Sequence, residues 1–218
     1  MGLGVYPATD SRFMGMLGMH GTYQANMAMH NADLIIAIGA RFDDRITNTP
    51  KLFAPNAKII HFDVDHSSVS KIIEANIAVF GQVKNSLRAI IDTINNSNDD
   101  YDLSQIDSWK EQIKEWTEQH GLNHDLYLSE TDESQILPQQ VVQHVYQITE
   151  GNAYVTSDVG QHQMFAAQYY HFDEPRKWIN SGGLGTMGFG LPAAMGVKFA
   201  FPKDCLLYTS PSPRDHQP

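Results

Sequence analysis

The sequence predicts an α/β fold built on parallel sheets, one in each half of the chain. Two observations support this. Short aliphatic runs alternate with stretches of helical periodicity, and most of the runs end at or just before a glycine or an aspartate. In addition, the glycine-rich segment 180–196 follows the apolar run 177–179 and leads into a helix-forming stretch. In open sheets of this kind ligands bind beyond the carboxyl ends of the strands, so these ends are where we expect a site.

Composition limits the classes of protein that the chain can be. It has 218 residues, 42% of them hydrophobic, which is enough to bury a core in one large or two small domains. No apolar run is long enough to span a membrane, and residues 1–6 lack the pattern of a signal peptide. The single cysteine, Cys205, excludes an internal disulfide framework and predicts a cytoplasmic location. Although the net charge is −10, the acidity is concentrated in residues 96–135, and no basic stripe predicts nucleic-acid binding.

The first half, residues 1–95, predicts alternating helices and strands. Thr22 is a suitable N-cap for a helix that ends near Asn31. The elements expected after it are a strand over 33–39, a strand over 57–65, a helix from Ser67, a strand over 78–81 and a helix over 83–94. Together they predict a doubly wound parallel sheet.

Charged residues follow the strands of this half. The segment 41–45 places two arginines and two aspartates directly after Gly39, and Asp63 and Asp65 end the next strand. Arginine binds phosphate or stacks on rings, and a carboxylate at a strand tip accepts hydroxyl groups of a nucleotide. The alternative is a surface cluster of salt bridges. The glycine turn 15–21 either forms a methionine-lined packing surface or lies along an extended cofactor, and His20 within it is expected to pack or hydrogen-bond rather than bind metal.

A polar break at 95–100 predicts the end of this domain. Residues 96–134 are expected to form an acidic linker that contains an amphipathic helix over 104–120, with Trp109 and Trp116 as anchors against a neighbouring domain. The second domain is predicted over 135–204. Its expected elements are a helix that Pro138 opens, a strand over 153–157, a helix that ends near Tyr170, a strand over 177–179 and a helix after Pro192.

Two loops of the second domain, 159–162 and 182–190, follow successive strands and should face one crevice. Glycines and helix N-termini at such a place can hold a phosphate, although glycine-rich turns also serve tight packing. His162 is either structural or in contact with a phosphate or a reacting carbonyl. The Pro- and Ser-rich segment 205–218 shows no periodicity and is expected to be disordered and foreign to the rest of the pattern.

Several stretches together resemble the large catalytic subunits of the acetolactate synthase (acetohydroxyacid synthase) family, which are thiamine-diphosphate enzymes. The resemblance covers nearly all of residues 10–204, and it is carried by the stretches 16–21, 31–45, 61–65, 158–164 and 178–194. It implies that residues 1–95 are the C-terminal part of a Rossmann-like, FAD-binding central domain. Residues 135–204 would then begin an α/β domain that binds thiamine diphosphate.

The resemblance also implies a set of site residues. The flavin would be lined by Leu17, Gly18, Met19, His20, Gly21, Gly39, Ala40, Arg41, Asp43, Arg45, Asp63, Val64, Gly81, Gln82 and Val83. The substrate channel would be near Met16 and Asp44. Thiamine diphosphate would contact Val159, Gly160, Gln161, His162, Gly185 and Met187, with Gln161 and His162 as the catalytic contacts. At position 82 the family usually has aspartate where this chain has glutamine.

The activity implied is the condensation of two pyruvates, or of pyruvate with 2-oxobutyrate, to a 2-acetohydroxy acid with loss of CO2, in the biosynthesis of valine, leucine and isoleucine. The expected cofactors are thiamine diphosphate, FAD and Mg2+, and the expected partners are a second catalytic subunit and a small regulatory subunit. The family's activating glutamate and its Gly-Asp-Gly metal motif do not occur in this sequence. We therefore expect an internal fragment that has no metal ligands and is inactive alone. The alternatives are a glyoxylate carboligase or pyruvate oxidase type of enzyme, and a non-catalytic nucleotide-binding module.

Overall fold

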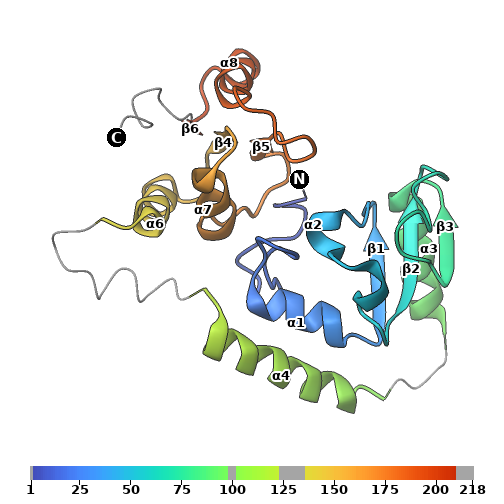
Figure 1. Ribbon diagram of the computed structural model, residues 1–218. Helices are drawn as coiled ribbons and strands as arrows, with labels where there is room; N and C mark the ends of the chain where they lie inside the picture. Colours follow the sequence, from blue (N-terminus) through green and yellow to red (C-terminus); the bar gives the residue numbers. More distant parts are fainter. Residues whose placement is uncertain (1, 98–101, 123–135, 210–218) are drawn as a thin grey trace. The chain divides into compact units, whose positions relative to one another are not determined.

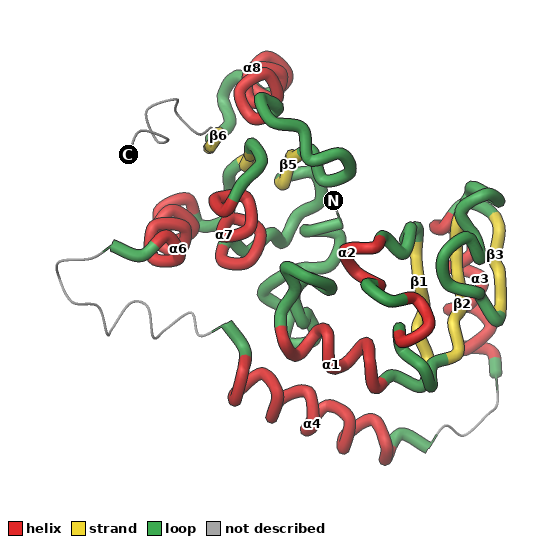
Figure 2. The backbone as a smooth tube through the Cα atoms, viewed as in Figure 1, coloured by secondary structure: helices red, strands yellow, loops and turns green. Residues whose placement is uncertain are grey.

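The computed structural model describes residues 2–97, 102–122 and 136–209, which form both helices and strands (Figure 2). The chain divides into two compact units. The first unit comprises residues 16–122. The second comprises residues 1–15 together with 123–218, so the first 15 residues belong with the C-terminal half. The domain predicted over residues 1–95 is a different grouping from these contact-based units.

The described part of the first unit contains a three-stranded parallel sheet in the order β1-β2-β3 (Figure 1). Its strands are β1 (Leu34–Ile38), β2 (Lys58–Asp63) and β3 (Ile77–Phe80), which confirms the predicted parallel sheet. The helices are α1 (Tyr23–Asn31), α2 (Asp44–Thr47), the 3-10 helix η1 (Pro50–Leu52), α3 (Val83–Asn96) and α4 (Ser104–His120). The buried hydrophobic cluster of this unit includes side chains of the sheet itself and of the loops beside it: Ala37, Phe42, Ile59 and Ile73.

Local sequence signals explain the ends of the helices around this sheet. Thr22 adopts an extended conformation, and its hydroxyl accepts the Ala25 amide at 3.3 Å, so the predicted N-cap of α1 is confirmed. The predicted amphipathic helix is α4, which packs on α1. Trp109 and Trp116 of α4 contact each other edge to face, with ring centroids 5.7 Å apart.

The prediction of a helix from Ser67 is wrong, because residues 67–75 form turns. Both oxygens of the Asp65 carboxylate accept hydrogen bonds from Ser67 and Ser68, so short polar side chains take the place of helical backbone bonds. Ser70 then adopts a left-handed conformation with φ 56°, and its hydroxyl accepts the Ala75 amide. Asp, Ser and Asn compete with helix formation in this way, and helical periodicity does not reveal the competition.

The described part of the second unit contains a second three-stranded parallel sheet, in the order β5-β4-β6. Its strands are β4 (Tyr154–Ser157), β5 (Trp178–Asn180) and β6 (Leu206–Thr209). Helices α6 (Pro138–Thr149) and α7 (Gln161–Tyr169) lie on one side of the strands, and α8 (Gly190–Ala200) lies on the other (Figure 1). This is the arrangement of a doubly wound sheet.

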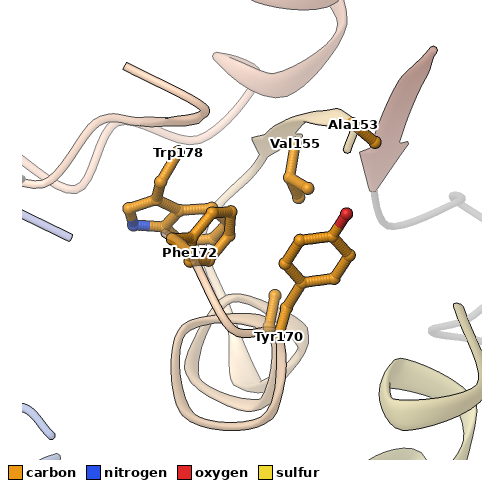
Figure 3. Close-up of a cluster of buried hydrophobic side chains, with 6 residues drawn as sticks. Ala153, Val155, Tyr170, Phe172 and Trp178 are labelled. Carbon is orange, nitrogen blue, oxygen red and sulfur yellow. The ribbon is translucent and has the colours of Figure 1, made fainter. Parts of the chain in front are cut away.

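The core of this unit is aromatic. Ala153, Val155, Tyr170, Phe172 and Trp178 gather between β4, β5 and the end of α7 (Figure 3). The Phe172 ring lies 4.8 Å from that of Tyr170 and 5.3 Å from that of Trp178, centroid to centroid. Leu3 packs against this cluster, and the Thr9 amide and hydroxyl both donate to Asp173 at 3.0 Å. These contacts explain why the first 15 residues join the second unit.

The expectation that the irregular tail begins at Cys205 is also wrong. Leu206–Thr209 form β6, which pairs in parallel with β4 over all four residues. Leu206 and Leu207 are half-buried and pair in register with β4. The Pro and Ser residues after them dominate the composition of the segment, so composition does not reveal this strand. The remainder of the predicted tail, 210–218, and the acidic linker 123–135 lie outside the described residues.

Candidate cofactor sites at the strand ends

The two strand tips on which the sequence argument depends are neighbours. Strands β4 and β5 pair directly in parallel, with Ser157 opposite Asn180. The loops that follow them, 158–160 and 181–189, therefore start side by side at one edge of the sheet. The strand tips before Val159–His162 and before the glycine-rich loop are thus neighbours, and a common crevice for the two loops stays a prediction.

A buried carboxylate joins these two loops. Asp158 is only 2% exposed, and its Oδ1 accepts the backbone N–H groups of Val159 and Gly188, both at 2.8 Å. The other oxygen, Oδ2, accepts the same Gly188 amide at 3.0 Å. Sequence reasoning did not include Asp158 among the site residues. The available signal was an aspartate directly after a buried strand and before a glycine, where a carboxylate commonly accepts loop amides.

Gly190 brings α8 against the strand ends. A Cβ at this position would lie 2.7 Å from the Thr209 carbonyl oxygen and 2.8 Å from the Asp158 nitrogen, so no larger residue fits without a shift of the backbone. The Thr156 hydroxyl donates to the Gly190 carbonyl at 3.3 Å. The first turn of α8 is thus fixed at the edge where α7 also begins. Helix N-termini attract anions, since their first N–H groups lack partners within the helix.

The glycine-rich loop itself is open. Added Cβ atoms at Gly183 and Gly188 would meet nothing within 4 Å, and one at Gly185 would meet only the Val159 side chain, at 3.9 Å. The structure therefore brings together Gly185 and Val159, two of the predicted cofactor contacts. Met187 is 71% exposed and makes no part of the core. A loop with this much space beside its backbone can accept a ligand at close range.

The two predicted catalytic contacts lie in the first turn of α7. The His162 ring lies over Gly160, so that a Cβ on that glycine would be 2.9 Å from its Cε1 atom. Its Nε2 atom is buried and has no hydrogen-bond partner among the described residues. Gln161 is exposed. An orphaned imidazole nitrogen beside a glycine and a helix N-terminus fits a site for a phosphorylated ligand.

The first unit has a strand edge of its own. The Gly39 amide donates to the Phe62 carbonyl at 2.8 Å, and the Gly81 amide donates to the Asp63 carbonyl at 3.2 Å, so the tips of β1, β2 and β3 are joined. Added Cβ atoms at Gly39 and Gly81 would meet nothing within 4 Å. Asp63, Gly39 and Gly81, three of the predicted flavin contacts, therefore share one edge.

Residues 16–21 of the glycine turn are held beside the charged cluster of the same unit. The Asn26 side chain exchanges hydrogen bonds with the Gly18 backbone, at 2.7 and 3.0 Å, and the Met19 amide donates to the Arg45 carbonyl at 2.8 Å. A Cβ on Gly18 would lie 2.3 Å from that carbonyl oxygen. The structure thus brings the segments 17–21 and 41–45 together. Met16 is half-buried there, while Leu17, Met19 and His20 are exposed.

The side chains of segment 41–45 form exposed ion pairs. Arg41 pairs with Asp43, and Arg45 pairs with Asp44 at 3.0 Å. Both interpretations of the cluster, surface salt bridges and ligand contacts, are compatible with this geometry, because exposed pairs hold their partners weakly. Val64 and Gln82 are also exposed, and Ala40 and Val83 are half-buried.

Asp63 and Asp65 are both predicted at the end of one strand, but their carboxylates have different surroundings in the structure. The Ser67 hydroxyl and amide hold the pKa of the Asp65 carboxyl below its usual value, and Asp65 serves its own turn. The Asp63 side chain is 12% exposed, and its Oδ1 accepts the Asp65 amide at 2.8 Å. Asp63 is therefore the better placed of the two for a ligand at the edge.

Within the described ranges, no group of three or more His, Cys, Asp or Glu side chains is arranged to hold a metal ion. A search of the same ranges finds no helix with the length and apolar character needed to cross a membrane.

Comparison with known proteins agrees with this geometry. Residues 1–90 match the family model of the thiamine pyrophosphate enzyme central domain, and residues 158–209 match that of the thiamine pyrophosphate enzyme C-terminal TPP binding domain. The chain therefore belongs to the thiamine pyrophosphate enzymes.

Within that class it belongs with the acetolactate synthase large subunits. It is 51% identical over 207 residues to the acetolactate synthase isozyme 3 large subunit of Escherichia coli, an alignment that covers 95% of this chain and 35% of that relative. It is 53% identical over 203 residues to the Haemophilus influenzae large subunit, covering 93% and 34%. The chloroplastic acetolactate synthase 1 of Nicotiana tabacum is 39% identical over 207 residues, covering 95% and 30%. The chain thus spans about a third of the length of these relatives.

Proposed function

We propose that this chain is part of an acetolactate synthase that condenses two pyruvates, or pyruvate with 2-oxobutyrate, to a 2-acetohydroxy acid with loss of CO2. This reaction would serve the biosynthesis of valine, leucine and isoleucine. The observation that carries the proposal is the edge formed by β4 and β5, where Asp158 ties two loops together beside two helix N-termini. The similarity to acetolactate synthase large subunits selects the reaction.

Thiamine diphosphate fits the second unit. Val159–His162 and the open loop at Gly185 would bind its diphosphate and ring, and Met187 would contact the ring from the exposed side of the loop. When bound, the cofactor supplies the nucleophile and the electron sink for decarboxylation and carbon–carbon bond formation. The chain contributes orientation through the Asp158 bridge, and the unpartnered Nε2 of His162 can hold a proton or accept one at the reacting region.

FAD is the second cofactor of the proposal, and the first unit fits it. The open glycine edge, the segment 17–21 and the arginines of segment 41–45 would bind it, with Asp63 accepting hydroxyl groups. Met16 and Asp44 would border the substrate channel. Mg2+ is the third cofactor of the proposal, and the described residues contain no group of three or more His, Cys, Asp or Glu side chains arranged to hold it. A second catalytic subunit, a small regulatory subunit and a cytoplasmic location remain predictions.

Cofactor binding is tested by thermal unfolding of this chain with added ligands. FAD, and separately thiamine diphosphate with Mg2+, are expected to raise the melting temperature, since a ligand that binds only the folded state stabilises it. A response to FAD or NAD without any response to thiamine diphosphate would favour the non-catalytic nucleotide-binding module instead.

The reaction is tested in a chimera. Residues of the Escherichia coli isozyme 3 large subunit that align with this chain are replaced by this sequence, and acetolactate formed from pyruvate is measured. We expect the chimera to form acetolactate and the isolated chain to form none. A chimera that folds and binds thiamine diphosphate, but forms no acetolactate from pyruvate, contradicts the proposal and favours a glyoxylate carboligase or pyruvate oxidase type of reaction.

A further inference from the structure

His61 is a fully buried histidine whose ring lacks hydrogen-bond partners. It lies on β2, it is 0% exposed, and neither Nδ1 nor Nε2 makes a hydrogen bond within the described residues. A buried polar group without a partner destabilises the folded state, because it loses its bonds to water. A leucine at this position would avoid that cost, so the imidazole needs another explanation.

The surroundings of His61 connect it with the edge of the first unit. Asp63 is two residues further along β2 and therefore points to the same face of the sheet. The Nε2 atom of His61 lies 3.8 Å from Oδ2 of Asp63, slightly beyond hydrogen-bond distance. The Asp63 carboxylate is otherwise engaged only through Oδ1, with the Asp65 amide, among the bonds that the structure describes.

A second contact of the ring leads to the charged cluster. The Phe42 ring meets His61 edge to face, with centroids 5.2 Å apart. Phe42 is 7% exposed and has a left-handed backbone with φ 52°, which bulky residues rarely adopt, so packing against its ring helps to hold this conformation. His61 is thus next to both segments that would bind the flavin at this edge. Its ring contacts the turn at 41–45 and lies close to the carboxylate at the tip of β2.

We propose that His61 is a positioning residue for the flavin site, one that orients the Asp63 carboxylate and supports the turn at Phe42. In the FAD complex the imidazole donates its Nε2–H to Oδ2 of Asp63, closing the 3.8 Å gap, so that the other carboxylate oxygen accepts from the cofactor. The inference rests on the proposed FAD site and adds to it a residue that does not touch the cofactor. A small rotation of the Asp63 side chain is enough to form the bond.

A double-mutant cycle on this chain tests the coupling, with FAD affinity measured by flavin fluorescence. His61→Leu and Asp63→Asn are each expected to weaken binding on the order of tenfold, as the loss of a hydrogen bond to a charged group does. If His61 acts through Asp63, the double variant is no weaker than either single variant. His61→Gln, which keeps a donor, is expected to restore part of the affinity.

Two controls separate positioning from folding. His61→Leu is expected to unfold at the same temperature as the parent chain or higher, because it removes an unpartnered polar group. His30→Leu, an exposed histidine at the end of α1, is expected to leave FAD affinity unchanged. In addition, nitrogen NMR of the His61 ring reports its tautomer, and FAD should shift it to the Nε2–H form in the parent chain but not in Asp63→Asn.

Four outcomes overturn the inference. If the parent chain binds FAD and His61→Leu binds it equally well, the inference fails while the flavin site stands. The same holds if the two single effects add, or if FAD leaves the His61 tautomer unchanged. Absence of FAD binding by the parent chain overturns the flavin site and, with it, the role of His61.

Discussion

The two strand edges of this chain share the same parallel α/β geometry but present opposite kinds of surface. In the first unit, the side chains that follow the strands are charged and exposed, such as Arg41, Asp43 and Arg45. In the second unit, the loops after the strands present glycine backbone, and the charge is a buried carboxylate, Asp158, that serves the protein itself. The first edge would bind a ligand with side chains, and the second with backbone N–H groups.

This difference shows where stability and binding are separable. Exposed ion pairs contribute little to folding, so the charged cluster can be changed with effects on the ligand alone. A buried carboxylate that accepts backbone amides contributes to both, because its removal leaves those amides unpaired and releases the loops. The two edges should therefore respond very differently to the loss of one charged side chain.

The largest effect is expected for Asp158→Ala. It removes the acceptor for the Val159 and Gly188 amides and should lower the free energy of unfolding by roughly 3 kcal/mol, the scale of two charge-assisted hydrogen bonds. Thiamine diphosphate binding should be lost as well. Urea unfolding and calorimetry measure the two effects. Asp204→Ala, an exposed aspartate of the same unit, should change neither.

A pair of glycines on α8 gives the next largest effect. Gly190→Ala places a Cβ 2.7 Å from the Thr209 carbonyl oxygen and should destabilise the chain by about 1–3 kcal/mol. Gly196→Ala, on the same helix with open space around it, should stabilise by up to about 1 kcal/mol, because alanine favours the helix. Equal effects of the two substitutions in urea unfolding would mean that α8 does not approach the strand ends as described.

The sequence predicted the strand tips but not what joins them. Aliphatic runs that end at or just before a glycine or an aspartate located β1, β2, β3 and β4, since such runs are typical of buried parallel strands, and the apolar run 177–179 located β5. Asp158 joins the two loops through a hydrogen bond from Gly188, which lies 30 residues away in sequence. The close approach of β6 leaves no room for a side chain at Gly190. Such contacts between distant residues leave no local pattern. Similarly, Leu206–Thr209 is too short and too close to prolines to be separated from its surroundings by composition alone.

The pH dependence of stability offers a smaller test, specific to the second unit. Burial lowers the pKa of His171 below its ordinary value of 6.5, and Asp173 partly offsets this shift. As the pH falls below 6.5, the unfolded chain takes up the proton before the folded chain does, so the free energy of unfolding should decrease towards pH 5. In His171→Gln this part of the decrease should disappear. Urea unfolding at several pH values measures it, and an identical slope in the variant would exclude His171 as the cause.

The smallest effect on folding is expected for Arg41→Ala, at the first edge. Arg41 and its partner Asp43 are both exposed, so the free energy of unfolding should change by less than about 0.5 kcal/mol. FAD affinity should nevertheless fall on the order of tenfold, because an arginine contact to a phosphate would be lost. Lys110→Ala, which removes an exposed ion pair with Asp107 on α4, is the control for charge alone and should leave FAD affinity unchanged. If Arg41→Ala weakened folding as strongly as Asp158→Ala, the contrast between an exposed edge for the ligand and a buried carboxylate for the fold would be wrong.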